Sequence, residues 1–112
     1  VASRQRAFAD ELSDFLLLLA SGLRAGLSFT HSLASAAEDD KGEVGRQMRR
    51  VLREVNVGAS LDGALLECAN RMDNEDLRWL VTALQDQVRK PFQIADLVRH
   101  VEETVAAAAP RS

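Results

Sequence analysis

The chain has 112 residues, of which 46% are hydrophobic and 28% are charged, and its formal net charge is −3. This length suffices for one domain with a hydrophobic core, and the charged fraction argues against a membrane-embedded protein. The negative charge disfavours a general nucleic-acid binder, because phosphate contacts need a basic surface. The single cysteine, Cys68, excludes an intrachain disulfide and fits a reducing compartment.

The most apolar run covers residues 15–20, between Asp14 and Arg24. A membrane span needs about 20 apolar residues, so this run predicts a buried helix in a soluble domain. The N-terminus carries no signal-peptide pattern and begins at Val1 instead of methionine. We therefore expect a fragment of a longer protein whose flanks hold further segments.

Apolar residues recur at helical spacing along the whole chain, with no sustained alternation of period two. Six apolar stripes predict six helices, and these stripes run over residues 8–23, 29–37, 44–55, 61–72, 77–88 and 94–105. The predicted fold is all-α, a compact bundle of about six helices with mostly antiparallel neighbours. It forms a single domain over 1–112, with an ordered core over about 7–105. Leu17 and Leu18 widen the first stripe, which predicts that this helix, over 7–24, lies at the centre.

Two turns share one sequence pattern. Gly26-Leu27-Ser28-Phe29, followed by Leu33 and Ala37, is matched by Gly58-Ala59-Ser60-Leu61, followed by Leu65 and Ala69. The offset is the same for every pair, 32 positions from 26 to 58. Each glycine permits a sharp reversal and each serine caps the next helix. Either any two helical hairpins would look this similar, or the chain contains a duplicated helical hairpin.

The fifth predicted helix begins at a cap supplied by Asp73 or Asn74, and Pro91 separates it from the sixth. Between the second and third helices, residues 38–42 form a polar turn. Its acidic residues could attract a cation, but they lack the alternating ligands of a calcium loop, which favours a solvated acidic turn.

Side chains that could support catalysis lack the necessary companions. Ser28 and His31 lie three residues apart, but Ser28 is explained as a helix cap and His31 as an exposed residue. Cys68 belongs to an apolar stripe, which predicts an inert core thiol. His100 and Glu103 have the i, i+3 spacing of helical metal ligands, but matching ligands on other helices are missing, so a surface pair is expected. We predict no catalytic site, no metal and no cofactor.

Arginines give the third helix a basic side, and they are Arg46, Arg49, Arg50 and Arg53. Arg46, Arg50 and Arg53 share one face by their i, i+4, i+7 spacing. One interpretation is a solvated face with a salt bridge to Glu43, Glu54 or a neighbouring helix. The other is a docking patch for an acidic protein surface.

Trp79, the only tryptophan, follows Arg78 on the fifth helix. It is either a core residue or half-exposed at a partner interface, where tryptophan is enriched. The candidate partner-docking residues are therefore Arg46, Arg49, Arg50, Arg53, Arg78 and Trp79. At the N-terminus, Arg4 and Arg6 could mark the cytoplasmic side of an upstream membrane span.

The order of several short motifs resembles one known family. They are residues 12–19 leading into Leu23-Arg24-Ala25-Gly26-Leu27-Ser28, then Leu33, Val51-Leu52-Arg53-Glu54-Val55, Gly58-Ala59-Ser60-Leu61 with Ala64-Leu65, the segment 76–84, and Ala95-Asp96-Leu97 with Glu102-Glu103-Thr104. From about Phe8 to Val105 the chain resembles the cytoplasmic F domain of type II secretion and type IV pilus platform proteins, especially the TadB/TadC-like proteins of tight-adherence (Tad) pili. In one departure, Pro91-Phe92-Gln93-Ile94 replaces a Gly-Gly-Asn-Leu-like turn, so the sixth helix is expected to start with a different geometry.

This resemblance implies a non-catalytic domain on the cytoplasmic face of the bacterial inner membrane, attached through flanking segments. The implied partners are an assembly ATPase and either a paralogous platform protein or a second copy of the chain. The domain would couple the ATPase to pilin assembly through protein–protein contacts.

Two other interpretations stay open from the residues alone. A helical DNA-binding regulator could use a helix-turn-helix near the third and fourth helices, favoured by the basic third helix and opposed by the overall acidity. A small enzyme could use His100 or His31.

Overall fold

The computed structural model describes residues 2–86 and 92–108. Six helices make up the fold, and they are α1 (Ala2–Arg24), α2 (Phe29–Asp39), α3 (Glu43–Asn56), α4 (Leu61–Met72), α5 (Glu75–Gln85) and α6 (Ile94–Ala108). No strand occurs in these two ranges, which confirms the all-α prediction and the number of helices. Val88 and Pro91, which the sequence placed around the end of the fifth helix, lie outside the described residues, as do the side chains of Arg4 and Arg6.

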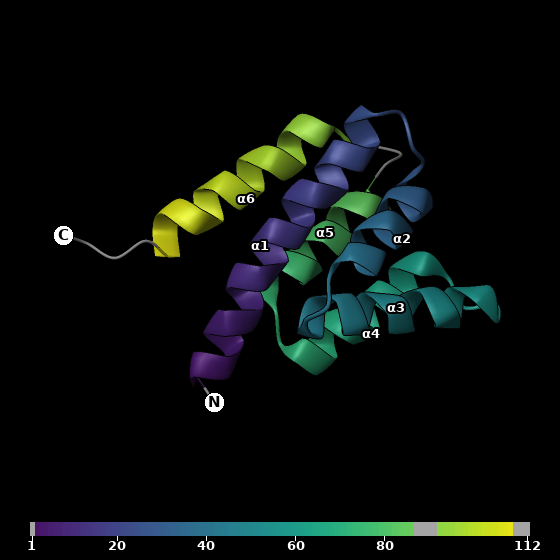
Figure 1. The fold of residues 1–112 in the computed structure, drawn as a ribbon, viewed down its shortest axis with the longest axis horizontal. Coiled ribbons are helices and arrows are strands. Elements are labelled where there is room, and N and C mark those ends of the chain that lie inside the picture. Colours follow the sequence, from purple (N-terminus) through teal and green to yellow (C-terminus); the bar gives the residue numbers. More distant parts are fainter. Residues whose placement is uncertain (1, 87–91, 109–112) are drawn as a thin grey trace.

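The helices pack pairwise along the chain, and α1 joins the two sides of the molecule (Figure 1). On one side of α1 lies α6, which runs antiparallel to it. On the other side α1 contacts α2 and α3, and the chain continues through α3–α4 and α4–α5 contacts. Each helix contributes to one buried core, for example through Leu12, Leu33, Val51, Leu65, Leu80 and Leu97.

The predicted width of the apolar stripe on the first helix is wrong. Phe15 and Leu16 are buried, but Leu17 and Leu18 are 41% and 43% exposed. These two leucines remain partly accessible although α2, α3 and α6 all pack against α1, so the buried stripe of α1 is narrower than predicted. Val105, predicted to face inward on the sixth helix, is also 51% exposed.

Both glycine turns have the same backbone geometry. Gly26 has φ 94° and Gly58 has φ 114°, in the left-handed region that favours glycine. Each turn closes with the two backbone hydrogen bonds of a Schellman motif. In the first turn the N–H groups of Gly26 and Leu27 donate to the carbonyls of Leu23 (3.0 Å) and Gly22 (3.1 Å). In the second turn those of Gly58 and Ala59 donate to the carbonyls of Val55 (3.1 Å) and Glu54 (3.0 Å). The acceptors and donors of the two turns are thus again separated by the same 32 positions.

Serine caps begin the helices that follow these turns. The Ser28 hydroxyl accepts a hydrogen bond from the His31 backbone N–H at 3.1 Å, and the Ser60 hydroxyl accepts one from Gly63 at 3.2 Å. The structural roles predicted for Gly26, Ser28, Gly58 and Ser60 are those that the structure gives them. Asn74, and not Asp73, caps α5, because its side chain accepts from the Leu77 N–H.

The repeat extends from the turns into the core. Residues at equivalent positions of the two hairpins are buried in both, and these pairs are Leu12/Val44, Leu16/Met48, Leu19/Val51, Leu33/Leu65, Ala36/Cys68 and Ala37/Ala69. A chance likeness of two hairpins would not place cap, turn and core residues in one register. Helices α1–α2 and α3–α4 are therefore two copies of one hairpin, and α5 and α6 lie outside the repeat.

A carboxylate from α1 caps α3. The N-cap residue of α3 is Gly42, which has no side chain to accept a hydrogen bond. Instead the Glu11 carboxylate accepts one from the Val44 N–H at 2.9 Å, and a Cβ atom at Gly42 would collide with that carboxylate. Burial, and then the neighbouring Asp40, raise the pKa of Glu11 above its ordinary value.

We predict that Ser28→Ala and Ser60→Ala each lower the free energy of unfolding by about 1 kcal/mol, because each removes an equivalent N-cap acceptor. Urea denaturation measures both values. Ser35→Ala, at an exposed position inside α2, is the matched control and should leave stability unchanged or slightly raised. A large loss for only one of the two caps would contradict their structural equivalence.

A second prediction concerns pH. Because the pKa of Glu11 is raised in the folded chain, its contribution to stability is present below the ordinary value of 4.5 and is lost as pH rises through the raised pKa. Glu11→Gln keeps an acceptor for Val44 and should be at least as stable as the parent chain at neutral pH. Urea unfolding at about pH 7 and about pH 4 should show the parent gaining on this variant at the lower pH. A relative loss at low pH would show that ionised Glu11 is favoured by folding.

Candidate partner-docking site

Two of the predicted docking arginines on α3 form ion pairs within their own helix. Arg46 lies 2.5 Å from the Glu43 carboxylate, and Arg50 lies 3.3 Å from that of Glu54. Both arginine side chains are largely exposed, so these pairs contribute little to stability. They correspond to the solvated-face interpretation of the basic helix.

Arg49 has a structural contact instead. Its guanidinium donates to the backbone carbonyls of Ala37 at 2.6 Å and Asp40 at 2.9 Å, at the C-terminal end of α2. Helix C-termini leave carbonyls without intrahelical partners and carry a partial negative charge. Arg49 therefore joins α3 to α2 and is engaged within the fold.

Arg53 is the member of this set that is exposed and uncommitted. It lies in the last turn of α3 and forms no ion pair or side-chain hydrogen bond with residues 2–86 or 92–108. A cation in the last turn of a helix is favourably placed with respect to the helix dipole. Of the predicted arginines, Arg53 is thus the most available to a partner.

Arg78 joins the end of α4 to the start of α5. Its guanidinium donates to Asp73 at 3.0 Å, Glu75 at 2.8 Å and Asn70 at 3.3 Å. The hydrogen bond to Asp73 is the main cause that raises the pKa of Arg78 above its ordinary value. Arg78 thus connects two helices of the fold, and its role differs from that of its sequence neighbour Trp79.

Trp79 is half-buried and stacks on His100 of α6. The two ring centroids are 4.1 Å apart and the rings are nearly parallel, at 7°. His100 donates through Nε2 to the Asp76 carboxylate at 2.8 Å, and Thr104 donates to the same oxygen at 3.1 Å. This hydrogen-bonded group fixes the imidazole, and the imidazole in turn covers one face of the indole.

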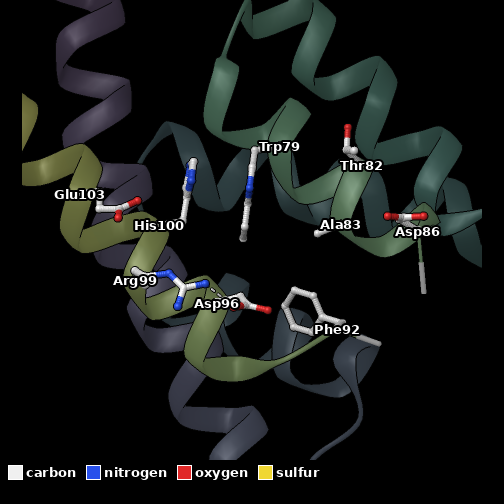
Figure 2. A pocket seen from close by; sticks show the side chains of 9 residues that line it. All are labelled: Trp79, Thr82, Ala83, Asp86, Phe92, Asp96, Arg99, His100 and Glu103. Atoms are coloured by element: carbon white, nitrogen blue, oxygen red, sulfur yellow. Dashed lines mark hydrogen bonds and ion pairs between the residues drawn. The ribbon is translucent and has the colours of Figure 1, made fainter. Parts of the chain in front are cut away.

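A pocket of about 310 Å³ opens beside this stack, between α5 and α6 (Figure 2). Its lining combines two aromatic rings with several charged groups, and the residues are Trp79, Thr82, Ala83, Asp86, Phe92, Asp96, Arg99, His100 and Glu103. Phe92 also packs edge-on against Phe29 at the start of α2, with centroids 6.1 Å apart. This contact anchors the chain just before α6, where the sequence departs from the Gly-rich turn.

The sequence alone does not reveal this pocket. Asp76 and Trp79 are three residues apart on α5, and His100 and Thr104 are four apart on α6, so each pair shares a helix face. This spacing is the only sign of the pocket in the sequence. It does not show that these faces of α5 and α6 contact each other, because that contact depends on how α6 packs against α1.

The residues that the sequence raised as catalytic or metal-binding candidates lie in different surroundings. The His31 Nδ1 lies 3.2 Å from the Ser28 hydroxyl in an exposed turn, and Cys68 is fully buried. Burial raises the pKa of the Cys68 thiol, which suppresses the reactive thiolate. His100 pairs with Asp76 and not with Glu103, so the predicted surface pair is wrong. Within the described ranges no three His, Cys, Asp or Glu residues gather as a metal site.

The geometry defines an all-α domain with surface contacts and a shallow interhelical pocket. Among its described helices, none is both long and apolar enough to cross a membrane. The chain belongs to the family of type II secretion system protein F, whose family model matches residues 15–107. Comparisons with curated proteins and with solved structures found no match. Members of the F family are platform proteins of the inner membrane without catalytic activity, so this chain is not an enzyme.

The different contacts of two arginines on one helix give a stability prediction. Arg49→Ala should lower the free energy of unfolding by about 2 kcal/mol, because it removes two charge-assisted hydrogen bonds to the end of α2. Arg53→Ala, the matched control, should change it by less than about 0.5 kcal/mol. Chemical denaturation of both variants measures the difference. Equal effects would show that the Arg49 contacts contribute nothing to the folded state.

Proposed function

We propose that this chain is the cytoplasmic domain of a platform protein in a Tad-type pilus assembly machine, a relative of the type II secretion system. The observation that carries this proposal is the family match, which covers residues 15–107. The finer TadB/TadC-like assignment rests on the order of the short motifs around Gly26, Gly58 and Trp79. Membrane-spanning segments would flank the domain in the parent protein and hold it at the inner membrane.

In this function the domain transmits movement through contacts. An assembly ATPase in the cytoplasm would bind one surface of the domain, and the domain would pass the resulting displacement to the membrane segments that handle pilin. A second copy of the chain or a paralogous platform protein would complete the platform. Exposed Leu17 and Leu18 on α1 offer an apolar surface for such association.

Topology of the parent protein tests the proposal directly. Because Cys68 is buried, a cysteine introduced at exposed Ser35 of the full-length protein is labelled with a membrane-impermeant thiol reagent; it should react in inverted membrane vesicles but not in intact cells. Deletion of the gene should abolish pilus assembly or secretion, with restoration by the intact gene. A parent protein found entirely outside the membrane fraction would overturn the platform assignment.

Charge reversal tests the docking role of α3. Arg53→Glu in the full-length protein should weaken co-purification with the assembly ATPase about tenfold, because it places like charge opposite an acidic partner surface. Arg24→Glu is the matched control, since Arg24 lies in the last turn of α1 and is also exposed. Equal retention of the ATPase by both variants would remove α3 from the interface.

A DNA-binding regulator, the other function considered from the basic third helix, has little support from the structure. Of the four α3 arginines, Arg49 is engaged with α2, and two others pair with carboxylates of α3 itself. Phosphate contacts would have to compete with those pairs. A gel shift at low salt would reveal such binding, and it would contradict the platform proposal.

A further inference from the structure

The pocket between α5 and α6 has the size of a site for one side chain. At about 310 Å³ it lies at the lower end of the range for small-molecule pockets, and it is half-open to solvent (Figure 2). A bulky cofactor would not be enclosed there. A single long side chain from another protein would fit in it.

One aromatic surface in the pocket is held flat and in place. His100 covers one face of Trp79, and Asp76 with Thr104 fixes His100. The opposite face of the indole is turned toward Phe92 and the α5 side of the pocket (Figure 2). An occupant would therefore meet a preorganised ring face, with little loss of side-chain freedom on binding.

Among the described residues that line the pocket, carboxylates outnumber arginine and lysine side chains. Asp96 pairs with Arg99, the one arginine or lysine in this described set. Asp86, at the end of α5, and Glu103, on α6, form no ion pair or side-chain hydrogen bond with residues 2–86 or 92–108. Asp86 lies on the same side of the indole as Phe92 but farther away, beyond Ala83 at the end of α5, so it adds negative charge at that end of the pocket (Figure 2).

We propose that this pocket binds an arginine side chain of a partner protein. The guanidinium stacks on the open face of Trp79 beside Phe92, and the Asp86 carboxylate attracts it electrostatically from the end of α5. Arginine fits better than lysine because its planar, weakly hydrated cation stacks on aromatic rings and accepts a desolvated position more readily. The proposal rests on the proposed function only in requiring a protein partner, and it names the chemistry by which Trp79 recognises that partner.

Trp79 is the only tryptophan, so its fluorescence and its indole N–H resonance report on this pocket alone. The probe is a capped peptide with one arginine between glycines, titrated into the 112-residue chain at low ionic strength. Two peptides of the same length, with citrulline or lysine in place of arginine, are titrated in parallel. We expect a saturable change for the arginine peptide in the millimolar range, and binding at least about fivefold weaker for citrulline.

Matched variants separate specific binding from general attraction to an acidic protein. Asp86→Asn should weaken binding of the arginine peptide about threefold or more. Glu67→Gln removes the same charge from an exposed position on α4 and should leave binding unchanged. Arg89 and Lys90 follow Asp86 closely in the sequence and carry the same charge as the arginine peptide. The double variant R89A/K90A is therefore also titrated and should bind the arginine peptide at least as tightly as the parent chain. Far-UV circular dichroism verifies that each variant is folded.

Several results would overturn the proposal. They are equal binding of the citrulline or lysine peptide, equal effects of Asp86→Asn and Glu67→Gln, loss of binding in R89A/K90A, or an unchanged Trp79 signal at saturating peptide. None of these measurements involves the ATPase or the membrane, so failure here leaves the topology and co-purification tests of the platform function standing.

Discussion

The arrangement of the whole domain depends on the buried stripe of α1. Leu12, Leu16 and Leu19 of this stripe are at most 2% exposed, and both sides of the molecule pack against the helix that carries them. Burying each such leucine contributes about 1.5–3 kcal/mol, which is large beside the net stability of a small domain. Because α6 and the α2–α3 layer touch α1 on different sides, a change in α1 would move both.

Local signals in the sequence predicted most of the fold. Helix number, the serine caps and the glycine turns were all readable, because each depends on residues within one or two turns of the chain. The 32-residue repeat was visible for the same reason. The exposure of Leu17 and Leu18 was not readable, because the same leucine-rich pattern fits a helix buried on all sides and a helix with one open face.

The candidate site depended on information of another kind. The sequence pointed to Trp79 and a group of arginines as docking residues, but it did not indicate which of these side chains form contacts within the fold. Arg49 and Arg78 contact neighbouring helices, whereas the Arg53 side chain forms no ion pair or hydrogen bond with the described residues. Whether an arginine meets a carbonyl, a carboxylate or solvent is decided by how one helix packs against the next. The partnership of Trp79 with His100 has the same origin, and no spacing within one helix could specify it.

The duplication bears on where a signal would pass through the domain. Two copies of one hairpin form α1–α4, and α5 and α6 are additions that pack on different copies. Helix α5 packs against α4, while α6 packs against α1. The Trp79–His100 stack and the hydrogen bonds to Asp76 join the two additions directly. A partner that occupies the pocket touches both helices at once, and through them both hairpins. Binding there would therefore favour one relative placement of the hairpins over another, to the extent that its affinity differs between them. For the proposed role in transmitting displacement, the junction of the two non-repeated helices is the position from which both halves can be influenced by one contact.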